Sequence, residues 1–242
     1  MIAALIRLIR RLRLTAAQYL SVHLLVGMAV SLLSLFAFAA IADEVGEDEF
    51  MVRLDTALAN EFYASATPER TELFRTISLF GNEGLVILLL AVTVYLGLRQ
   101  AWWALAVWLG GVFGGMLLNL FLKEVFERPR PVFETLLVEE AHYAFPSGHA
   151  MNSLITYGLL AYLIALNLKH RIARILVVFA AVIAIVLIGI SRLYLGVHYL
   201  SDVIGGYMVG IVWLAVCVAA MEIIRRRHVK AQGTHDAPPA EG

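Results

Sequence analysis

The sequence predicts an all-α, polytopic membrane protein with six transmembrane helices, and three observations support that prediction. First, 61% of the 242 residues are hydrophobic and 16% are charged, whereas soluble domains are roughly half apolar and a quarter charged. Second, the chain contains six long apolar runs, which match membrane spans of about 20 residues each. Third, basic residues collect at one set of ends of these runs. We therefore expect one domain embedded in a lipid bilayer.

The apolar runs define the predicted domain, which covers residues 17–224. It follows a basic terminus over residues 1–16 and precedes a polar tail over residues 225–242, which we expect to be disordered because it is poor in apolar residues. The first run resembles a secretory signal, but at about 25 residues it is longer than the 7 to 15 apolar residues of such signals. The six runs extend from Ala17 to Ile41, Ile77 to Leu98, Trp102 to Leu122, Ser147 to Leu166, Ile172 to Ile190 and Tyr199 to Ile224.

Charge segregation gives the predicted topology. Basic residues mark cytoplasmic ends of membrane spans, so we expect both termini to be cytoplasmic and the two long loops to lie outside. The basic residues are Arg7, Arg10, Arg11, Arg13, Arg99, Lys169, Arg171, Arg174, Arg225, Arg226, Arg227 and Lys230. The acidic residues of the opposite loops are Asp43, Glu44, Glu47, Asp48, Glu49, Glu134, Glu139 and Glu140.

The first outer loop contains an amphipathic pattern that predicts a short interfacial helix. A helix packed on the mouth of the bundle is an equal alternative, because the same pattern produces it. The apolar positions are Phe50, Leu54, Ala57, Leu58 and Phe62, and the polar positions on the other side are Arg53, Asp55 and Glu61.

Small residues at four-residue spacing indicate close helix packing. We expect these contacts within the bundle, and a homodimer seam is the alternative. The glycines are Gly110, Gly111, Gly114, Gly115, Gly206 and Gly210.

Cys217 is the only cysteine, so the chain forms no internal disulfide and no thiol zinc cluster.

The first of three polar clusters follows the third apolar run. Lys123 ends that run, and Arg130 precedes Pro131, which favours an extended conformation and ends the helix. As ordinary anchors, Lys123, Arg128 and Arg130 would belong on the cytoplasmic side. Their place on the opposite side favours an anion site.

The second cluster begins the fourth run with the sequence Pro146-Ser147-Gly148-His149. Proline and serine are typical of a helix start, and helix N-termini bind phosphate through unpaired N–H groups. Ser147 adds a hydroxyl donor and Gly148 allows close approach. Alone, the tetrapeptide is equally consistent with a simple helix cap.

The third cluster links the fifth and sixth runs. It contains Arg192, His198 and Asp202. If the sixth helix has begun, His198 and Asp202 share a face, and the carboxylate can accept a hydrogen bond from Nδ1–H. The imidazole is then an activated nucleophile or base, although for an isolated pair a structural role would be favoured over a catalytic one.

The topology places all three clusters on one side of the membrane. Together they supply three cations, hydroxyl and amide donors and two histidines, without the carboxylate cluster that a metal ion would need. We therefore expect metal-independent phosphoryl transfer with no cofactor and no nucleic-acid partner. A channel or transporter is disfavoured, because it would place polar groups at mid-membrane.

The three motifs resemble those of the type 2 phosphatidic acid phosphatase, or lipid phosphate phosphatase, superfamily. Lys123 to Pro131 fits K-x6-R-P, Pro146 to His149 fits P-S-G-H, and Ser191 to Asp202 fits S-R-x5-H-x3-D. Six spans are similar to its bacterial membrane-bound branch rather than to its soluble acid phosphatase and vanadium haloperoxidase relatives.

The resemblance implies a role for each matching residue. His198 would form a phosphohistidine, Asp202 would orient it, and His149 would protonate the leaving oxygen and then activate water. Arg128 and His142, outside the motif, are expected to contact the loop or headgroups, and His23 in the first run is left unassigned. The phosphate-binding set would be Lys123, Arg130, Ser147, Gly148 and Arg192.

The resemblance also implies a substrate class, whereas the outward location follows from the distribution of Arg and Lys. The enzyme would remove the terminal phosphate of a lipid phosphate or pyrophosphate at the extracytoplasmic side of a bacterial inner membrane. Undecaprenyl pyrophosphate, converted to undecaprenyl phosphate, is the first expected substrate. Phosphatidylglycerophosphate or phosphatidate is the alternative, and phosphate transfer to another lipid is a further one.

Overall fold

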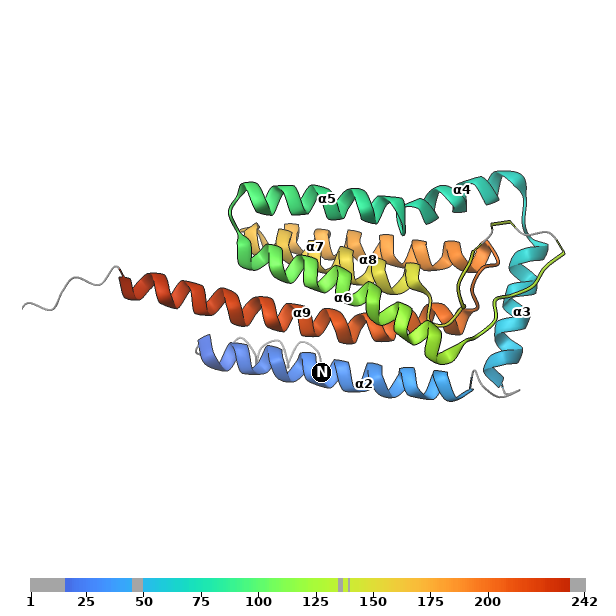
Figure 1. Cartoon of the computed structure of the whole chain (residues 1–242), viewed down its shortest axis with the longest axis horizontal. Helices are drawn as coiled ribbons and strands as arrows, with labels where there is room; N and C mark the ends of the chain where they lie inside the picture. The colour runs from blue at the N-terminus through green and yellow to red at the C-terminus, as the bar shows by residue number, and fades with distance from the viewer. Residues whose placement is uncertain (1–15, 45–49, 135–136, 139, 236–242) are drawn as a thin grey trace, which may run out of the picture.

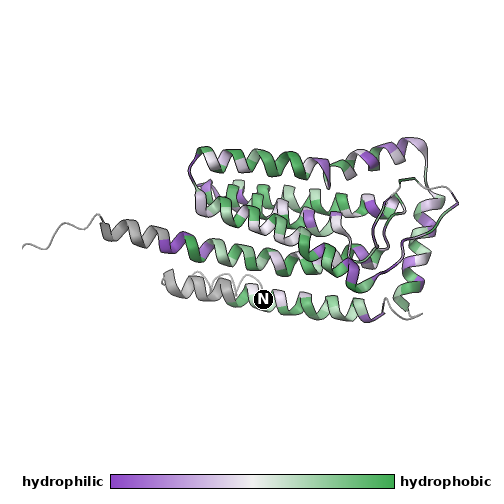
Figure 2. Cartoon of the chain, in the orientation of Figure 1, coloured by the Kyte–Doolittle hydropathy of each residue, from purple (hydrophilic) through white to green (hydrophobic). Residues whose placement is uncertain are grey.

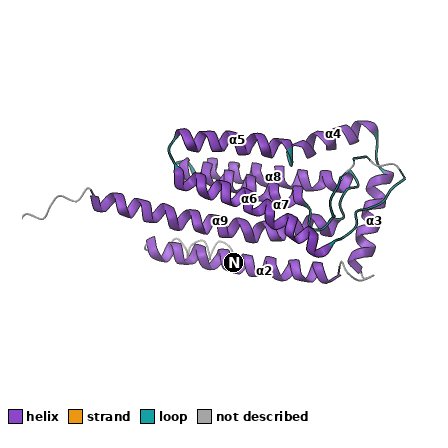
Figure 3. Cartoon of the chain, viewed as in Figure 1, coloured by secondary structure: helices purple, strands orange, loops and turns teal. Residues whose placement is uncertain are grey.

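The computed structural model describes residues 16–44, 50–134, 137–138, 140–235, with side chains from Leu25 to Arg227. Every regular element in these residues is a helix (Figure 1, Figure 3), which confirms the all-α class. The helices are α2 (Ala16–Glu44), α3 (Phe50–Ala64), α4 (Pro68–Leu79), α5 (Glu83–Leu98), α6 (Trp102–Phe126), α7 (Gly148–Asn167), α8 (Arg171–Tyr194) and α9 (Leu200–His235).

Six helical segments among the described residues are long and apolar enough to cross a membrane. They are α2, α4 together with α5, α6, α7, α8 and α9. Figure 2 shows hydrophobic residues along these segments and hydrophilic residues concentrated towards the end that carries α3 and the loop between α6 and α7. We call this end the mouth of the bundle. The chain is therefore a multi-pass membrane protein with the predicted number of spans.

The second span is longer than predicted and is interrupted. The sequence placed its start at Ile77, but α4 already begins at Pro68, where the Thr67 side chain caps the helix by accepting from the Arg70 amide at 3.3 Å. Because α4 contains many polar residues, hydropathy alone did not predict that it belongs to this span. Between α4 and α5, a Cβ on Gly81 would lie 2.6 Å from Ile188 and 2.9 Å from His149. The break therefore depends on a glycine to approach α7 and α8.

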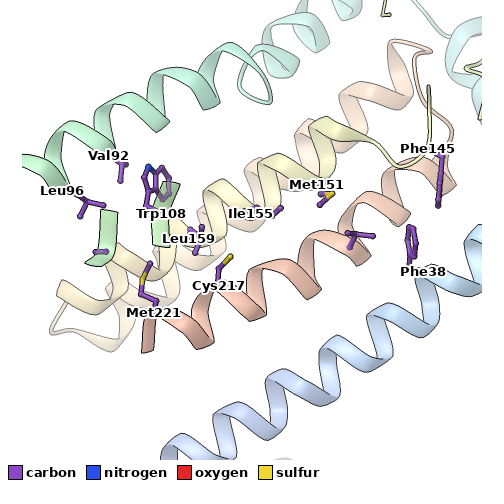
Figure 4. Packing of buried hydrophobic residues seen from close by; sticks show 12 residues of the cluster. Phe38, Val92, Leu96, Trp108, Phe145, Met151, Ile155, Leu159, Cys217 and Met221 are labelled. Carbon is purple, nitrogen blue, oxygen red and sulfur yellow. The ribbon is translucent and has the colours of Figure 1, made fainter. Parts of the chain in front are cut away.

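Helices α7 and α9 form the centre of the bundle. Helix α7 packs against α6, α8 and α9, and α2 packs along α9 on the outer side (Figure 1). Buried apolar side chains line these contacts from one end of the bundle to the other (Figure 4). In lipid such packing is driven by van der Waals contact rather than by exclusion of water. The fully buried members include Trp108, Phe145, Met151, Ile155, Leu159 and Met221.

The predicted glycine contacts lie within the bundle. A Cβ on Gly111 would lie 2.7 Å from Leu159, and one on Gly114 would lie 2.5 Å from the Trp213 ring. A Cβ on Gly206 would lie 2.7 Å from the Ser147 carbonyl oxygen. These glycines therefore bring α6 and α9 against their neighbours, which confirms the intramolecular interpretation for them.

Helix α3 crosses the mouth of the bundle and packs on the ends of α8 and α9 (Figure 1). The predicted helix is confirmed, and its packing matches the bundle-mouth alternative. Its predicted orientation is wrong at one position, because Asp55 is 1% exposed and lies on the buried face. An amphipathic pattern assumes that carboxylates face water, whereas this one faces a partner inside the protein.

The predicted C-terminal tail differs from the structure. We expected disorder from residue 225, but α9 continues as a helix to His235. Glu222 holds the Arg225 and Arg226 guanidinium groups at 2.6 to 3.0 Å in this extension. Residues 236–242, the basic residues of segment 1–15, residues 45–49 and Glu139 lie outside the described residues, as does the side chain of His23.

Candidate active site

The loop between α6 and α7 fixes two cations at the mouth. Helix α6 ends at Phe126, its C-cap residue Glu127 has a left-handed φ of 45°, and the chain then turns back across the mouth. The Lys123 ammonium donates to the Tyr143 carbonyl oxygen. Arg130 donates from Nε to the His142 carbonyl oxygen at 2.8 Å and from Nη1 to that of Val197 at 2.7 Å. Backbone oxygens therefore hold both cations in place.

The start of α7 offers a hydroxyl and amide groups beside these cations. Ser147 is the N-cap residue, and its buried Oγ has no hydrogen-bond partner among the described residues. The preceding turn is held by Asn119, whose Nδ2 donates to the Pro146 carbonyl oxygen at 3.2 Å. A Cβ on Gly148 would lie 2.9 Å from Asn119 Oδ1. An uncapped helix start with an unused hydroxyl is suited to an anion.

The turn between α8 and α9 places the predicted nucleophile. Gly196, with φ of +70°, reverses the chain direction after α8. His198 is 2% exposed, and its Nε2 lies 3.3 Å from Arg130 Nη1. Its Nδ1 lies 3.4 Å from Asp202 Oδ2, which also accepts from the Tyr199 amide at 2.7 Å. At this distance Nδ1 has no hydrogen-bond partner among the described residues.

The electrostatic environment keeps His198 neutral. Burial lowers the pKa of its imidazole well below the ordinary value of 6.5, and the positive charges of Arg130, Arg192 and Lys123 lower this pKa further. Since Arg130 can only donate, Nε2 can accept from it only through a lone pair. The neutral tautomer with its proton on Nδ1, which faces Asp202, would suit both neighbours and would leave Nε2 free as a nucleophile.

A cavity of about 670 Å³ opens beside this cluster. Its volume lies in the range typical of small-molecule sites. His149 and Arg192 form part of its wall, together with residues at the break between α4 and α5. The Arg192 side chain is 2% exposed and donates to the Ser78 hydroxyl of α4. The cavity is therefore lined by a histidine and a buried guanidinium.

All eight predicted site residues lie at the mouth of the bundle. His149 is within electrostatic range of Lys123, Arg130, Arg192 and His198, and Asp202 is in contact with His198. The backbone joins Ser147 to the same group, because its amide donates to the Asp202 carbonyl oxygen at 2.9 Å. Three segments that are distant in the sequence thus meet at one site.

Two charged residues at the site were not recognised from the sequence. We expected Arg128 to contact the loop or headgroups, but it is 8% exposed and pairs with Asp202 and with Asp55. Asp55 was placed on the wrong face of its helix. The available signal was the position of Arg128 two residues before Arg130, whereas no sequence pattern linked it to Asp55. His142 is an exposed loop residue, as expected.

Glu140 is a third residue that the sequence did not single out. Its carboxylate accepts from Arg192 and lies 3.7 Å from Arg130 Nη2. It also lines the cavity. In the sequence it is one of several acids in an outer loop, so only the fold distinguishes it from its neighbours.

The fold brings the three motifs together at one site, and comparison with known proteins identifies the family. The family model described as PAP2 superfamily matches residues 100–226, which is more than half of the chain. The chain belongs to the PAP2 superfamily. The match covers α6, α7, α8 and most of α9, with the loops between them, and it includes all eight predicted site residues.

Two curated relatives of this PAP2 protein come from Bacillus subtilis. The chain is 35% identical over 201 residues to phosphatidylglycerophosphatase B, and the alignment covers 80% of the chain and 96% of the relative. It is 30% identical over 162 residues to undecaprenyl-diphosphatase BcrC, and this alignment covers 58% of the chain and 78% of the relative. The PAP2 relatives are phosphatases, and this chain is a membrane lipid phosphatase of the same type.

Solved structures agree with the architecture of this PAP2 protein. A crystal structure of a transmembrane PAP2-type phosphatidylglycerolphosphate phosphatase from Bacillus subtilis superposes with a TM-score of 0.73 at 29% identity, covering 80% of the chain and 96% of that structure. The Aquifex aeolicus LpxE structure superposes with a TM-score of 0.55 at 20% identity, covering 68% of the chain and 94% of that structure. The latter likeness shows the fold alone.

Proposed function

We propose that the enzyme hydrolyses the terminal phosphate of a lipid phosphate or pyrophosphate through a phosphohistidine at His198. The observation that carries this proposal is the placement of His198 between two partners. Asp202 faces its Nδ1 at 3.4 Å, and Arg130 faces its Nε2 at 3.3 Å. A neutral imidazole backed by a carboxylate and directed at an anion-binding guanidinium is an activated nucleophile for phosphorus.

In the first step, the Nε2 lone pair of His198 attacks phosphorus, so that a P–N bond forms as the P–O bond to the lipid breaks. His149, which lines the cavity, donates a proton to the leaving oxygen. The imidazole of the intermediate is cationic, and Asp202 stabilises it. Phosphoryl transfer requires positioning and charge stabilisation above all, which the buried cations at the mouth would supply.

In the second step, neutral His149 takes a proton from water as the water oxygen attacks phosphorus. The P–N bond breaks, inorganic phosphate forms and His198 returns to its neutral state. General base catalysis of this kind contributes typically 10² to 10⁴ in rate. The groups that would hold the phosphoryl oxygens in both steps are Lys123, Arg130, Arg192, the Ser147 hydroxyl and the Gly148 amide.

Undecaprenyl pyrophosphate and phosphatidylglycerophosphate are the two substrates that we propose to compare first. The relative named undecaprenyl-diphosphatase supports the former, and the relative named phosphatidylglycerophosphatase B, with longer coverage, supports the latter. Both place an anionic headgroup at the membrane surface and an apolar tail in lipid. The cavity beside Arg192 and His149 suits either headgroup.

We place the active site on the extracytoplasmic side of a bacterial inner membrane. The support is the distribution of charge in the sequence. Arg99 and Lys169 lie in the connections at the end opposite the mouth, and Arg171 and Arg174 lie in the first turn of α8 at that end. Basic residues at such short connections belong in the cytoplasm. The mouth with its candidate site then faces outward.

Phosphate release from purified lipids in detergent tests the proposed function. The panel contains undecaprenyl pyrophosphate, phosphatidylglycerophosphate and phosphatidate, each with and without EDTA. We expect release in EDTA by the unaltered enzyme and none above background by His198→Ala. The matched control is His142→Ala, which removes an exposed loop histidine. Full activity of His198→Ala would refute the nucleophile, and loss of activity in EDTA would refute the metal-independent mechanism.

A further inference from the structure

The buried cluster behind His198 extends beyond the three motifs into α3. Arg128 Nη2 donates to Asp55 Oδ2 at 2.8 Å, and its Nη1 donates to Asp202 and, at 2.7 Å, to the Ser201 hydroxyl. Asp55, Ser201 and Asp202 are at most 1% exposed, and Arg128 is 8% exposed. One guanidinium thus joins a carboxylate of α3 to the carboxylate that faces His198.

Asp55 also attaches this cluster to the start of α9. Its Oδ1 accepts from the Ser201 amide at 3.0 Å, and its Oδ2 accepts from the Ser201 hydroxyl. Ser201 lies in the first turn of α9, next to Asp202. A carboxylate at a helix N-terminus satisfies unpaired amides and interacts favourably with the helix dipole. Asp55 therefore fixes the turn from which Asp202 projects.

The buried cluster contains two carboxylates and one guanidinium, and this excess of negative charge affects the proposed reaction. Arg128 alone would cancel the charge of Asp202, so that a cation forming on His198 would face a neutral pair. Asp55 supplies a second negative charge, and the three groups together carry one net negative charge next to the imidazole. Since charges interact strongly in a buried site, this excess favours the cationic phosphohistidine.

We propose that Asp55 is a positioning residue for the reaction, which acts through Arg128 to hold Asp202 oriented behind His198. This inference rests on the proposed function. Neither Asp55 nor Arg128 is among the residues that line the cavity, so Asp55 affects the chemical step without touching substrate. Helix α3 thereby becomes part of the catalytic apparatus.

The test measures kcat and KM for dioctanoyl phosphatidate, together with inhibition by orthophosphate. We expect Asp55→Asn to lower kcat about 10- to 100-fold, by analogy with the loss of residues that orient metal ligands, with KM and phosphate inhibition changed less than twofold. Asp55→Glu should recover part of kcat, since it restores the charge. The matched control is Glu61→Gln, which removes an exposed carboxylate from the same helix and should leave kcat unchanged.

Epistasis tests whether Asp55 acts through Arg128. We expect the double variant Asp55→Asn with Arg128→Gln to have a kcat no lower than Arg128→Gln alone, because the second change removes the link. Losses that multiply would refute action through Arg128, as would an Asp55→Asn enzyme that retains more than half of its kcat. If Asp55→Asn fails to fold, the kcat of Arg128→Lys tests the proposal instead. Lys has a single point charge and cannot serve two carboxylates in fixed directions, so an undiminished kcat would overturn the proposal.

A measurement without turnover separates this inference from the proposed function. Nitrogen NMR of labelled histidine, assigned with His198→Asn, reports the tautomer of His198. We expect the Nδ1–H tautomer in the unaltered enzyme and a mixture in Asp55→Asn. An unchanged tautomer together with an unchanged kcat would refute the positioning role. Absence of hydrolysis of every lipid in the panel by the unaltered enzyme would instead refute the proposed function.

Discussion

The carboxylate of Glu140 binds the guanidinium of Arg192 inside the candidate site. The same carboxylate lies 3.7 Å from Arg130, so one loop acid contacts two of the three cations that we expect to hold phosphate. A carboxylate and a phosphate compete for the same fork of guanidinium donors. We therefore expect the Glu140 carboxylate to compete with a bound phosphate for Arg192 and Arg130.

We predict that Glu140→Gln strengthens phosphate binding. The amide keeps the shape of the side chain but loses the charge, so Arg192 and Arg130 are freed for an external anion. Since the side chain of Glu140 is 27% exposed, the pair is partly screened and the expected gain is about two- to fivefold in the inhibition constant of orthophosphate. Glu134→Gln, an exposed acid of the same loop, is the control and should change nothing. Weaker phosphate binding in Glu140→Gln would contradict the competition.

A second prediction concerns the order of the two proposed steps. If His149 activates water, His149→Ala should slow breakdown of the phosphohistidine more than its formation when the leaving group needs no proton. With p-nitrophenyl phosphate, we expect a burst of p-nitrophenol close to one equivalent per enzyme, followed by turnover about 10² to 10⁴ slower. Rapid-quench measurement detects the burst. A proportional loss of burst and turnover would show that His149 acts in the first step alone.

The pKa of His198 gives a prediction about pH. Burial and the neighbouring cations lower this pKa below 6.5, so the native imidazole remains neutral where an unfolded histidine already binds a proton. Stability contributed by this group is present above about pH 6.5 and is lost as the pH falls, because the unfolded chain then binds the additional proton. Carbon NMR of labelled histidine should therefore show no protonation of His198 at pH 6.5, and Lys123→Met should raise the titration midpoint. A midpoint at or above 6.5 in the unaltered enzyme would contradict the assigned environment.

The sequence predicted the residues of this site more completely than the contacts between them. His198, Asp202 and His149 were recognisable because each lies in a short motif next to a helix start, where local rules apply. The partnership of Asp55 with Arg128 joins positions 73 residues apart, and no helical periodicity encodes such a contact. Hydropathy likewise missed the break at Gly81, because the residues on both sides of it continue one membrane span. Long-range pairing of buried charges had to be observed in the folded chain.

A matched pair of glycines tests the packing of α6. The Trp213 ring cannot move away from Gly114 easily, because its Nε1 donates to the Gly111 carbonyl oxygen at 2.8 Å. Gly114→Ala should destabilise the bundle by about 1 to 3 kcal/mol, as overpacking does. Gly110→Ala is the control, since a Cβ there meets nothing within 4 Å among the described residues. Alanine in an open helical position should leave stability unchanged or raise it by up to about 1 kcal/mol. Thermal unfolding in detergent compares the two variants.

The orientation of the mouth can be tested with single cysteines, because Cys217 is the only native cysteine and is buried. In a Cys217→Ala background, Glu134→Cys places a thiol in the loop at the mouth, and Lys169→Cys places one between α7 and α8. Both positions are exposed, so accessibility differs only through the membrane. We expect a membrane-impermeant maleimide to label Glu134→Cys in intact cells and to label Lys169→Cys only after the cells are permeabilised. The reverse pattern would place the candidate site in the cytoplasm, where basic loops are favoured, and would overturn the extracytoplasmic assignment without affecting the chemistry proposed for His198.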